Sequence, residues 1–120
     1  ATIGAIFAPD AAPDDFLARG GGATGLRPKG FRCASEDLAA LPGVMEALAA
    51  RHGEPIAPGG ILYGAEDRLL DPETHGRATA ETLPGFAYET LEGRGHMIPF
   101  SAPEATADFI RRMAARAEAA

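Results

Sequence analysis

The chain lacks the features that define several large classes of protein. Among its 120 residues it has one cysteine, Cys33, which excludes an intrachain disulfide framework and leaves no cysteine pair for a metal. It has no apolar run near the roughly 18 residues of a membrane span, and its start lacks the basic region of a signal peptide. Lys29 is its one lysine, and the net charge is −6, so a basic face for nucleic acid is not expected. We therefore expect a cytoplasmic protein with neither nucleic acid nor membrane as a partner.

Signals for metals and cofactors are equally sparse. The three histidines, at positions 52, 75 and 96, are too dispersed along the chain to suggest a metal site. Residues 20–25 satisfy the pattern G-x-G-x-x-G, but they follow a helix-like segment instead of a strand, and Leu-Arg-Pro after them opens a helix poorly. A flexible loop is the better interpretation, and we expect no metal and no cofactor.

The first half of the chain gives weak structural signals. Residues 1–32 are rich in glycine and proline, which predicts irregular structure with one short helix at about 13–19. Apolar residues at three- and four-residue spacing then predict a helix capped by Ser35, kinked or split at Pro42, and ended by Gly53.

The second half alternates between strand and helix patterns. Short apolar segments bounded by glycine predict strands at 61–63 and 86–91. Asp71-Pro72 opens the helix between them, and Ser101 to Glu104 forms a capping box before a final helix. This βαβα order predicts an α/β fold with a parallel sheet. If the chain is an isolated piece of a larger sheet, strand 60–63 should keep one edge unpaired.

An ionisable side chain follows each predicted strand. Asp67 comes after the first strand and His96 after the second. Because ligands bind beyond the carboxyl ends of parallel strands, these residues are candidates for one site, with the carboxylate orienting the imidazole as a base. This predicts a carboxylate oxygen within about 2.6–3.2 Å of a ring nitrogen. The alternative is that Asp67 is a turn residue and His96 a loop histidine bonded to backbone.

These segments resemble the C-terminal part of α/β-hydrolases. Residues 63–70 resemble the acid-bearing loop of that family, 83–97 its last strand and histidine loop, and 101–104 the start of its closing helix. The resemblance implies that residues 1–58 are a cap remnant with a connecting helix, and that 59–120 are the C-terminal βαβα of a hydrolase domain. It also implies that Asp67 is the triad acid and His96 the base. Some members place the acid on an earlier strand, which would leave Asp67 structural; Glu66 is a weaker substitute.

The nucleophile of that family is missing from the chain. No Gly-x-Ser-x-Gly elbow occurs. Cys33 and Ser35 precede the acid and the base in the correct order, but no glycines surround them to permit the strained turn, and no strand precedes them.

The resemblance therefore implies the C-terminal portion of a serine-type hydrolase that acts on an ester or related carbonyl substrate. Its partner would be the missing N-terminal portion of the same enzyme, and the chain alone would be inactive. Some relatives use an aspartate nucleophile, so the substrate stays open. The alternative is a non-catalytic binding or interaction module, or a subunit that completes a site with a partner chain.

Overall fold

The computed structural model describes residues 3–21, 27–51, 54 and 57–120. The chain divides into two compact units, one formed by residues 1–12 together with 53–120 and the other by residues 13–52. Each unit is described by itself. The expected division into a cap remnant, 1–58, and a hydrolase portion, 59–120, stays a prediction.

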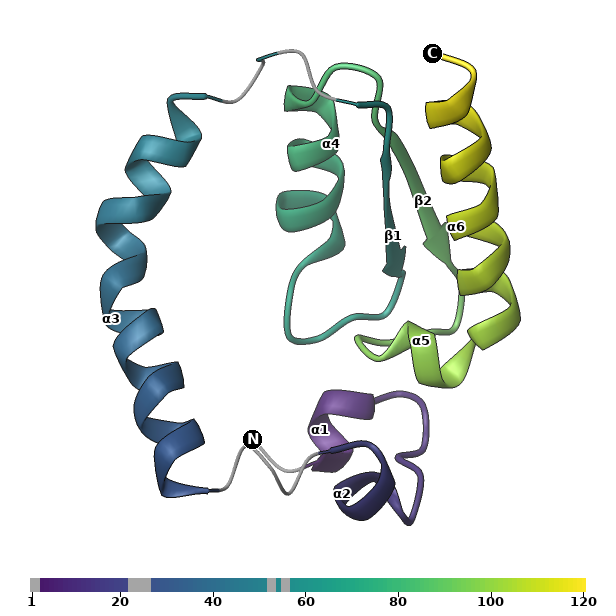
Figure 1. Ribbon diagram of the computed structural model, residues 1–120. Helices are drawn as coiled ribbons and strands as arrows, with labels where there is room; N and C mark the ends of the chain where they lie inside the picture. The colour runs from purple at the N-terminus through teal and green to yellow at the C-terminus, as the bar shows by residue number, and fades with distance from the viewer. Residues whose placement is uncertain (1–2, 22–26, 52–53, 55–56) are drawn as a thin grey trace. The chain divides into compact units, whose positions relative to one another are not determined.

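Two parallel strands form the sheet of the first unit (Figure 1). Strand β1 spans Gly60–Gly64 and strand β2 spans Ala87–Leu91, with Gly60 opposite Ala87 and Gly64 opposite Leu91. This confirms both predicted strands and their parallel pairing. Among the described residues β1 pairs with β2 alone, so its other edge carries no strand, as predicted.

The connection between the strands covers one face of the sheet. A π-helical segment, η2 (Pro72–Arg77), continues into helix α4 (Ala78–Thr82), which confirms the helix expected from Asp71-Pro72. The Asp71 carboxylate accepts the Thr74 N–H at 2.7 Å and so caps the segment. On β2, the Tyr88 hydroxyl donates to the Pro72 carbonyl at 2.9 Å, which fixes the connection against the sheet.

The C-terminal helix α6 (Pro103–Glu118) covers the opposite face of the sheet. Because Gly60 has no side chain, Phe109 and Met113 of α6 reach the backbone of β1 directly. Phe109 is buried, and the guanidinium of Arg112 donates to the Glu89 carboxylate of β2 at 2.5 Å. The expected final helix is thus present, but the predicted capping box is wrong. Ser101 ends a short helix, α5 (Ile98–Ser101), and no side chain caps α6, which starts at a proline with preset φ.

The N-terminal segment belongs to the sheet-bearing unit. Helix α1 (Ile3–Phe7) places Phe7 in the core with 1% of its surface exposed, and its ring meets Phe100 edge to face at 5.8 Å between centroids. The prediction that residues 1–32 are irregular apart from one short helix is therefore wrong. Phe7 is buried against residues more than 90 positions away, which no local pattern could indicate.

The second unit contains two helices. Helix α2 (Phe16–Arg19) confirms the short helix, whereas α3 (Pro28–Ala49) starts seven residues before the predicted N-cap. Arg27 is extended and Pro28 opens the helix, so Ser35 lies inside it and donates its hydroxyl to the Phe31 carbonyl. Proline removes a single backbone donor, and α3 continues through Pro42 without splitting.

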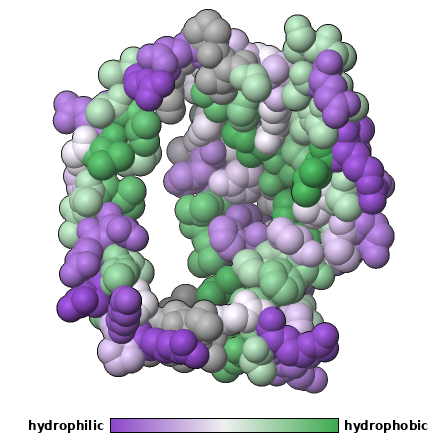
Figure 2. All heavy atoms as spheres, viewed as in Figure 1, coloured by the Kyte–Doolittle hydropathy of each residue, from purple (hydrophilic) through white to green (hydrophobic). Residues whose placement is uncertain are grey.

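Exposed hydrophobic side chains lie along α3 between its charged residues (Figure 2). Helix α3 ends at Ala49, before the predicted end at Gly53, and Gly53 itself lies outside the described residues, as does most of the glycine-rich segment 20–25.

Candidate catalytic dyad

Asp67 lies in the loop that follows β1, residues 65–71, called here the acid loop. One oxygen of its carboxylate, Oδ1, accepts the backbone N–H of Leu69 at 2.8 Å and that of Leu70 at 3.1 Å. Such local bonds from an aspartate to the backbone ahead of it are typical of a turn, and they leave the second oxygen available. With its side chain 2% exposed, Asp67 is held in one orientation by its own loop.

His96 lies in the loop that follows β2, residues 92–97, called here the histidine loop. Its Nδ1 lies 2.8 Å from Oδ2 of Asp67, within the predicted range. An ionised carboxylate only accepts hydrogen bonds, so Nδ1 carries the proton in this pair and Nε2 of the neutral ring keeps its lone pair. The histidine side chain is 32% exposed, so a molecule from outside can reach the ring. The pair Asp67 and His96 is called the dyad below.

Hydrogen bonding keeps the Asp67 carboxylate ionised. Burial by itself would raise the pKa of Asp67, but the hydrogen bonds from His96 and from the two loop N–H groups outweigh it and lower that pKa below its ordinary value. Burial also raises the pKa of Tyr63 on β1, and the nearby Asp67 charge adds to this effect. The dyad is thus a buried anion beside a partly exposed imidazole.

Backbone bonds join the two loops. The Ala65 N–H donates to the Leu91 carbonyl at 3.0 Å, and the Glu66 N–H donates to the Arg94 carbonyl at 2.9 Å. At Gly64, where β1 ends, a side chain is impossible because a Cβ there would lie 2.1 Å from the Gly95 carbonyl oxygen. This close approach sets the separation at which the aspartate and histidine side chains meet.

Asp10, which the sequence did not single out, also contacts the histidine loop. Its carboxylate accepts from the Arg94 guanidinium at 2.8 Å and from the Gly95 N–H at 3.1 Å, and its side chain is only 10% exposed. The Gly95 N–H is the main cause of a lowered pKa at Asp10, and Arg94 adds to it. Ser101 lies near enough to contribute, although its buried hydroxyl lacks the geometry of a hydrogen bond. A separation of 84 residues between Asp10 and Arg94 left no local signal.

The other residues considered from the sequence lie outside the dyad. Glu66 is exposed and contributes only its backbone. Cys33 is exposed on α3, and Ser35 is bonded within that helix, so neither lies on a strand-to-helix elbow. His75 is exposed and its Nδ1 lies 3.2 Å from the Asp71 carbonyl, while His52 is outside the described residues. In the part of the chain that is described, no three His, Cys, Asp or Glu side chains gather as metal ligands would.

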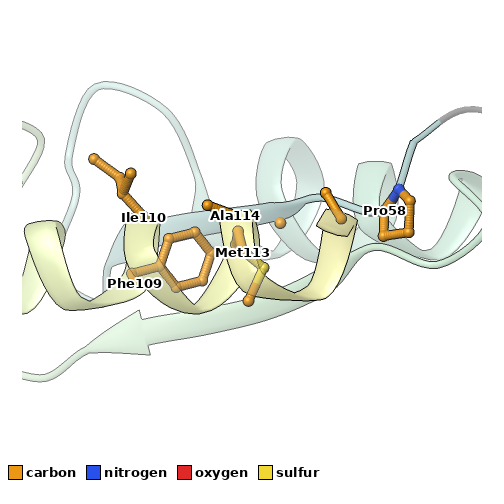
Figure 3. A pocket seen from close by; sticks show the side chains of 7 residues that line it. Pro58, Phe109, Ile110, Met113 and Ala114 are labelled. Carbon is orange, nitrogen blue, oxygen red and sulfur yellow. The ribbon is translucent and has the colours of Figure 1, made fainter. Parts of the chain in front are cut away.

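An apolar groove lies at the opposite end of β1 from the dyad (Figure 3). Its volume is about 380 Å³, and it runs between the start of the strand and α6. Ile110, at its border, is 60% exposed. The residues that line the groove are Pro58, Gly60, Phe109, Ile110, Met113, Ala114 and Ala117.

Comparisons with protein-family models, with curated proteins and with solved structures each find no match to this chain. The observed class is a chain of mixed helix and strand with two parallel strands in one sheet. Among the described helices, none combines the length and the apolar character that crossing a membrane requires.

Proposed function

We propose that this chain is the C-terminal portion of a serine-type α/β-hydrolase that acts on an ester or related carbonyl substrate. The observation that carries the proposal is the 2.8 Å contact between Nδ1 of His96 and Oδ2 of Asp67. Both residues follow the carboxyl ends of adjacent parallel strands, where α/β proteins bind their ligands. The resemblance of residues 63–70 and 83–97 to the acid and histidine loops of that family is in line with the proposal.

The chemistry follows from the protons of the dyad. Asp67 accepts the Nδ1 proton, so Nε2 of His96 is the free base. When a serine hydroxyl attacks the carbonyl carbon, Nε2 takes the hydroxyl proton and the buried carboxylate stabilises the imidazolium that forms. The imidazolium then gives that proton to the leaving alcohol. In the second half of the reaction Nε2 takes a proton from a water molecule as its oxygen attacks the acyl-serine carbonyl; the bond to the serine oxygen then breaks, the imidazolium returns the proton to that oxygen, and the acid leaves.

The serine and the oxyanion-binding loop would come from the N-terminal portion of the enzyme. The open edge of β1 is a fitting place for the preceding parallel strand, because unpaired strand edges readily accept a further strand. The apolar groove beside the start of β1 would be covered by the same portion. In the intact protein, burial of this groove and pairing of this edge would stabilise the sheet that carries the dyad.

Two experiments test the proposal. The coding sequence upstream of Ala1 should encode a Gly-x-Ser-x-Gly elbow; a Gly-x-Asp-x-Gly elbow would instead indicate the aspartate-nucleophile branch of the family. The purified chain should not hydrolyse a p-nitrophenyl ester, and addition of the N-terminal portion should restore activity. His96→Ala should then lower kcat by roughly 10²–10⁴-fold, whereas His75→Ala, an exposed histidine away from the dyad, should leave it unchanged.

Two outcomes would contradict the proposal. Ester hydrolysis by the isolated chain that disappears in His96→Ala would show that the chain carries its own nucleophile. An N-terminal portion that binds and contains a serine elbow, but gives activity insensitive to His96→Ala, would remove the base from the mechanism. A non-catalytic interaction module remains the alternative. The exposed apolar groove favours it, and binding without any activity is its expected result.

A further inference from the structure

We propose that Asp10 is a positioning residue for His96, acting by fixing the Arg94–Gly95 peptide group of the histidine loop. This inference rests on the proposed function, in which His96 is the base. It concerns a residue outside the acid loop and the histidine loop, in the N-terminal segment of the chain.

The Arg94–Gly95 peptide group is bonded at both ends. Its carbonyl oxygen accepts the Glu66 N–H of the acid loop at 2.9 Å, and its N–H donates to Oδ2 of Asp10 at 3.1 Å. A peptide group is planar, so two bonds on opposite edges define its orientation. Gly95 joins this peptide group to His96, so the orientation of the group restricts the position of the His96 Cα and of the imidazole attached to it.

The second oxygen of Asp10 adds a charged contact to the same loop. Oδ1 accepts from the Arg94 guanidinium at 2.8 Å, so one carboxylate holds both the side chain of Arg94 and the N–H of Gly95. Bonds between charged groups are stronger than neutral ones, and this carboxylate is largely shielded from water with 10% of its side chain exposed. Its lowered pKa fits a carboxylate that stays ionised in this position.

The backbone around Asp10 is itself packed tightly on the histidine loop. A Cβ at Gly95 would lie 2.1 Å from the Ala8 carbonyl oxygen, so the N-terminal segment touches the loop backbone directly. Phe7, which is 1% exposed, anchors this segment in the core against Phe100 of α5. The segment that carries Asp10 is therefore itself anchored, so the bonds of Asp10 restrain the histidine loop.

The two buried aspartates, Asp67 and Asp10, have different roles. Asp67 touches the imidazole and sets which nitrogen carries the proton. Asp10 bonds to Arg94 and Gly95, the two residues before the histidine, and sets how well the ring stays at Asp67. Loss of Asp10 should therefore leave the Nδ1–H tautomer in place but let the ring leave the carboxylate more often.

The test measures the Nδ1 proton of His96 in the 120-residue chain labelled with ¹⁵N at histidine. In the wild type this proton should give a downfield resonance that exchanges slowly with water. Asp10→Asn, which keeps the size of the side chain but loses its charge, should speed the exchange about tenfold or more, as loss of a charge-assisted hydrogen bond implies. Asp10→Glu should recover part of the protection, because the carboxylate is restored.

Matched controls separate positioning from a general loss of stability. Tyr88→Phe removes the hydroxyl that donates to the Pro72 carbonyl, a bond that lies in neither loop, and should lower the unfolding midpoint without speeding exchange of the His96 proton. Arg94→Gln keeps the bond from Gly95 to Asp10 and should give an intermediate acceleration. It serves as the second variant should Asp10→Asn not fold.

The outcomes distinguish this inference from the proposed function. The Asp10 inference is overturned if both Asp10→Asn and Arg94→Gln exchange the proton as slowly as the wild type does. It is also overturned if Tyr88→Phe accelerates exchange equally at the same unfolding midpoint. The proposed dyad fails on a different result: an Nδ1 proton resonance that Asp67→Asn leaves unchanged.

Discussion

Replacement of Asp67 tests the centre of the proposed site, because this carboxylate makes three hydrogen bonds with almost no access to water. Two bonds come from the backbone of its own loop at 2.8 and 3.1 Å, and the third joins Nδ1 of His96 at 2.8 Å. Each bond to a charged group contributes about 1.5–3 kcal/mol, and bonds that share one carboxylate are not additive. Asp67→Ala leaves three donors without their acceptor, so we expect the free energy of unfolding to fall by about 3–5 kcal/mol.

Asp67→Asn divides this effect into its parts. Its amide oxygen still accepts the two loop N–H groups, but its amide nitrogen, itself a donor, now faces Nδ1 of the ring. We expect a smaller loss of about 1–2 kcal/mol, together with a change of the His96 tautomer toward Nε2–H. In an enzyme completed by its N-terminal portion, this tautomer has no free base at Nε2, and kcat should fall by up to roughly 10⁴-fold.

Urea denaturation followed by far-UV circular dichroism measures the stability losses, and histidine ¹⁵N chemical shifts report the tautomer. Glu66→Ala is the matched control, because its side chain is exposed in the same loop, and it should change the free energy of unfolding by less than about 0.5 kcal/mol. The proposed role of Asp67 is contradicted if Asp67→Ala lowers the free energy of unfolding no more than Glu66→Ala does, or if Asp67→Asn leaves the ring in the wild-type tautomer.

Three further predictions concern the surroundings of the dyad. The pKa values of Asp10 and Asp67 are lower in the folded chain than in the unfolded chain, so the unfolded chain binds protons more readily. The stability that these carboxylates contribute is therefore fully present well above about pH 4 and is lost as pH falls through their folded-state pKa values. Measurement of the unfolding midpoint against pH should show this loss, and Asp10→Asn should make it smaller. Gly64→Ala should cost about 1–3 kcal/mol or more because its Cβ would lie 2.1 Å from a backbone oxygen, whereas Gly4→Ala, with open space around it, should cost nothing in the same urea titration. Phe7→Ala should cost about 3–5 kcal/mol, and Phe31→Ala, which removes a ring that is 71% exposed, should change the melting temperature little.

Patterns of short range were sufficient to predict the sheet and its connection. The strands at 60–64 and 87–91 are short apolar segments bounded by glycine, and their parallel pairing follows from the helix between them. Asp71-Pro72 supplies both an N-cap and a proline at the first helical position, so the start of the connecting helix could also be predicted. The proximity of Asp67 and His96 could be predicted from the same topology, because the loops after neighbouring parallel strands emerge at one edge of the sheet.

Local patterns failed where a contact outweighed the local preference. Ser35 has the chemistry of an N-cap, yet an extended Arg27 and the preset φ of Pro28 start the helix earlier and enclose the serine. Ser101 has the chemistry of a capping box, yet the turn after His96 draws it into α5, where its hydroxyl is buried. In both cases a competing start signal or tertiary packing decided the boundary.

Local patterns along the chain were enough to predict the strand-helix-strand-helix order of the second half and to place an aspartate and a histidine after its two strands. Those features depend on local periodicity and on residue chemistry, which neighbouring positions carry. The 2.8 Å contact between the two side chains and the bond from Asp10 to the neighbouring loop arise from the folding of distant segments onto one another. Such contacts join residues 29 and 85 positions apart, and they depend on packing at Gly64, Gly95 and Phe7 that no local pattern encodes.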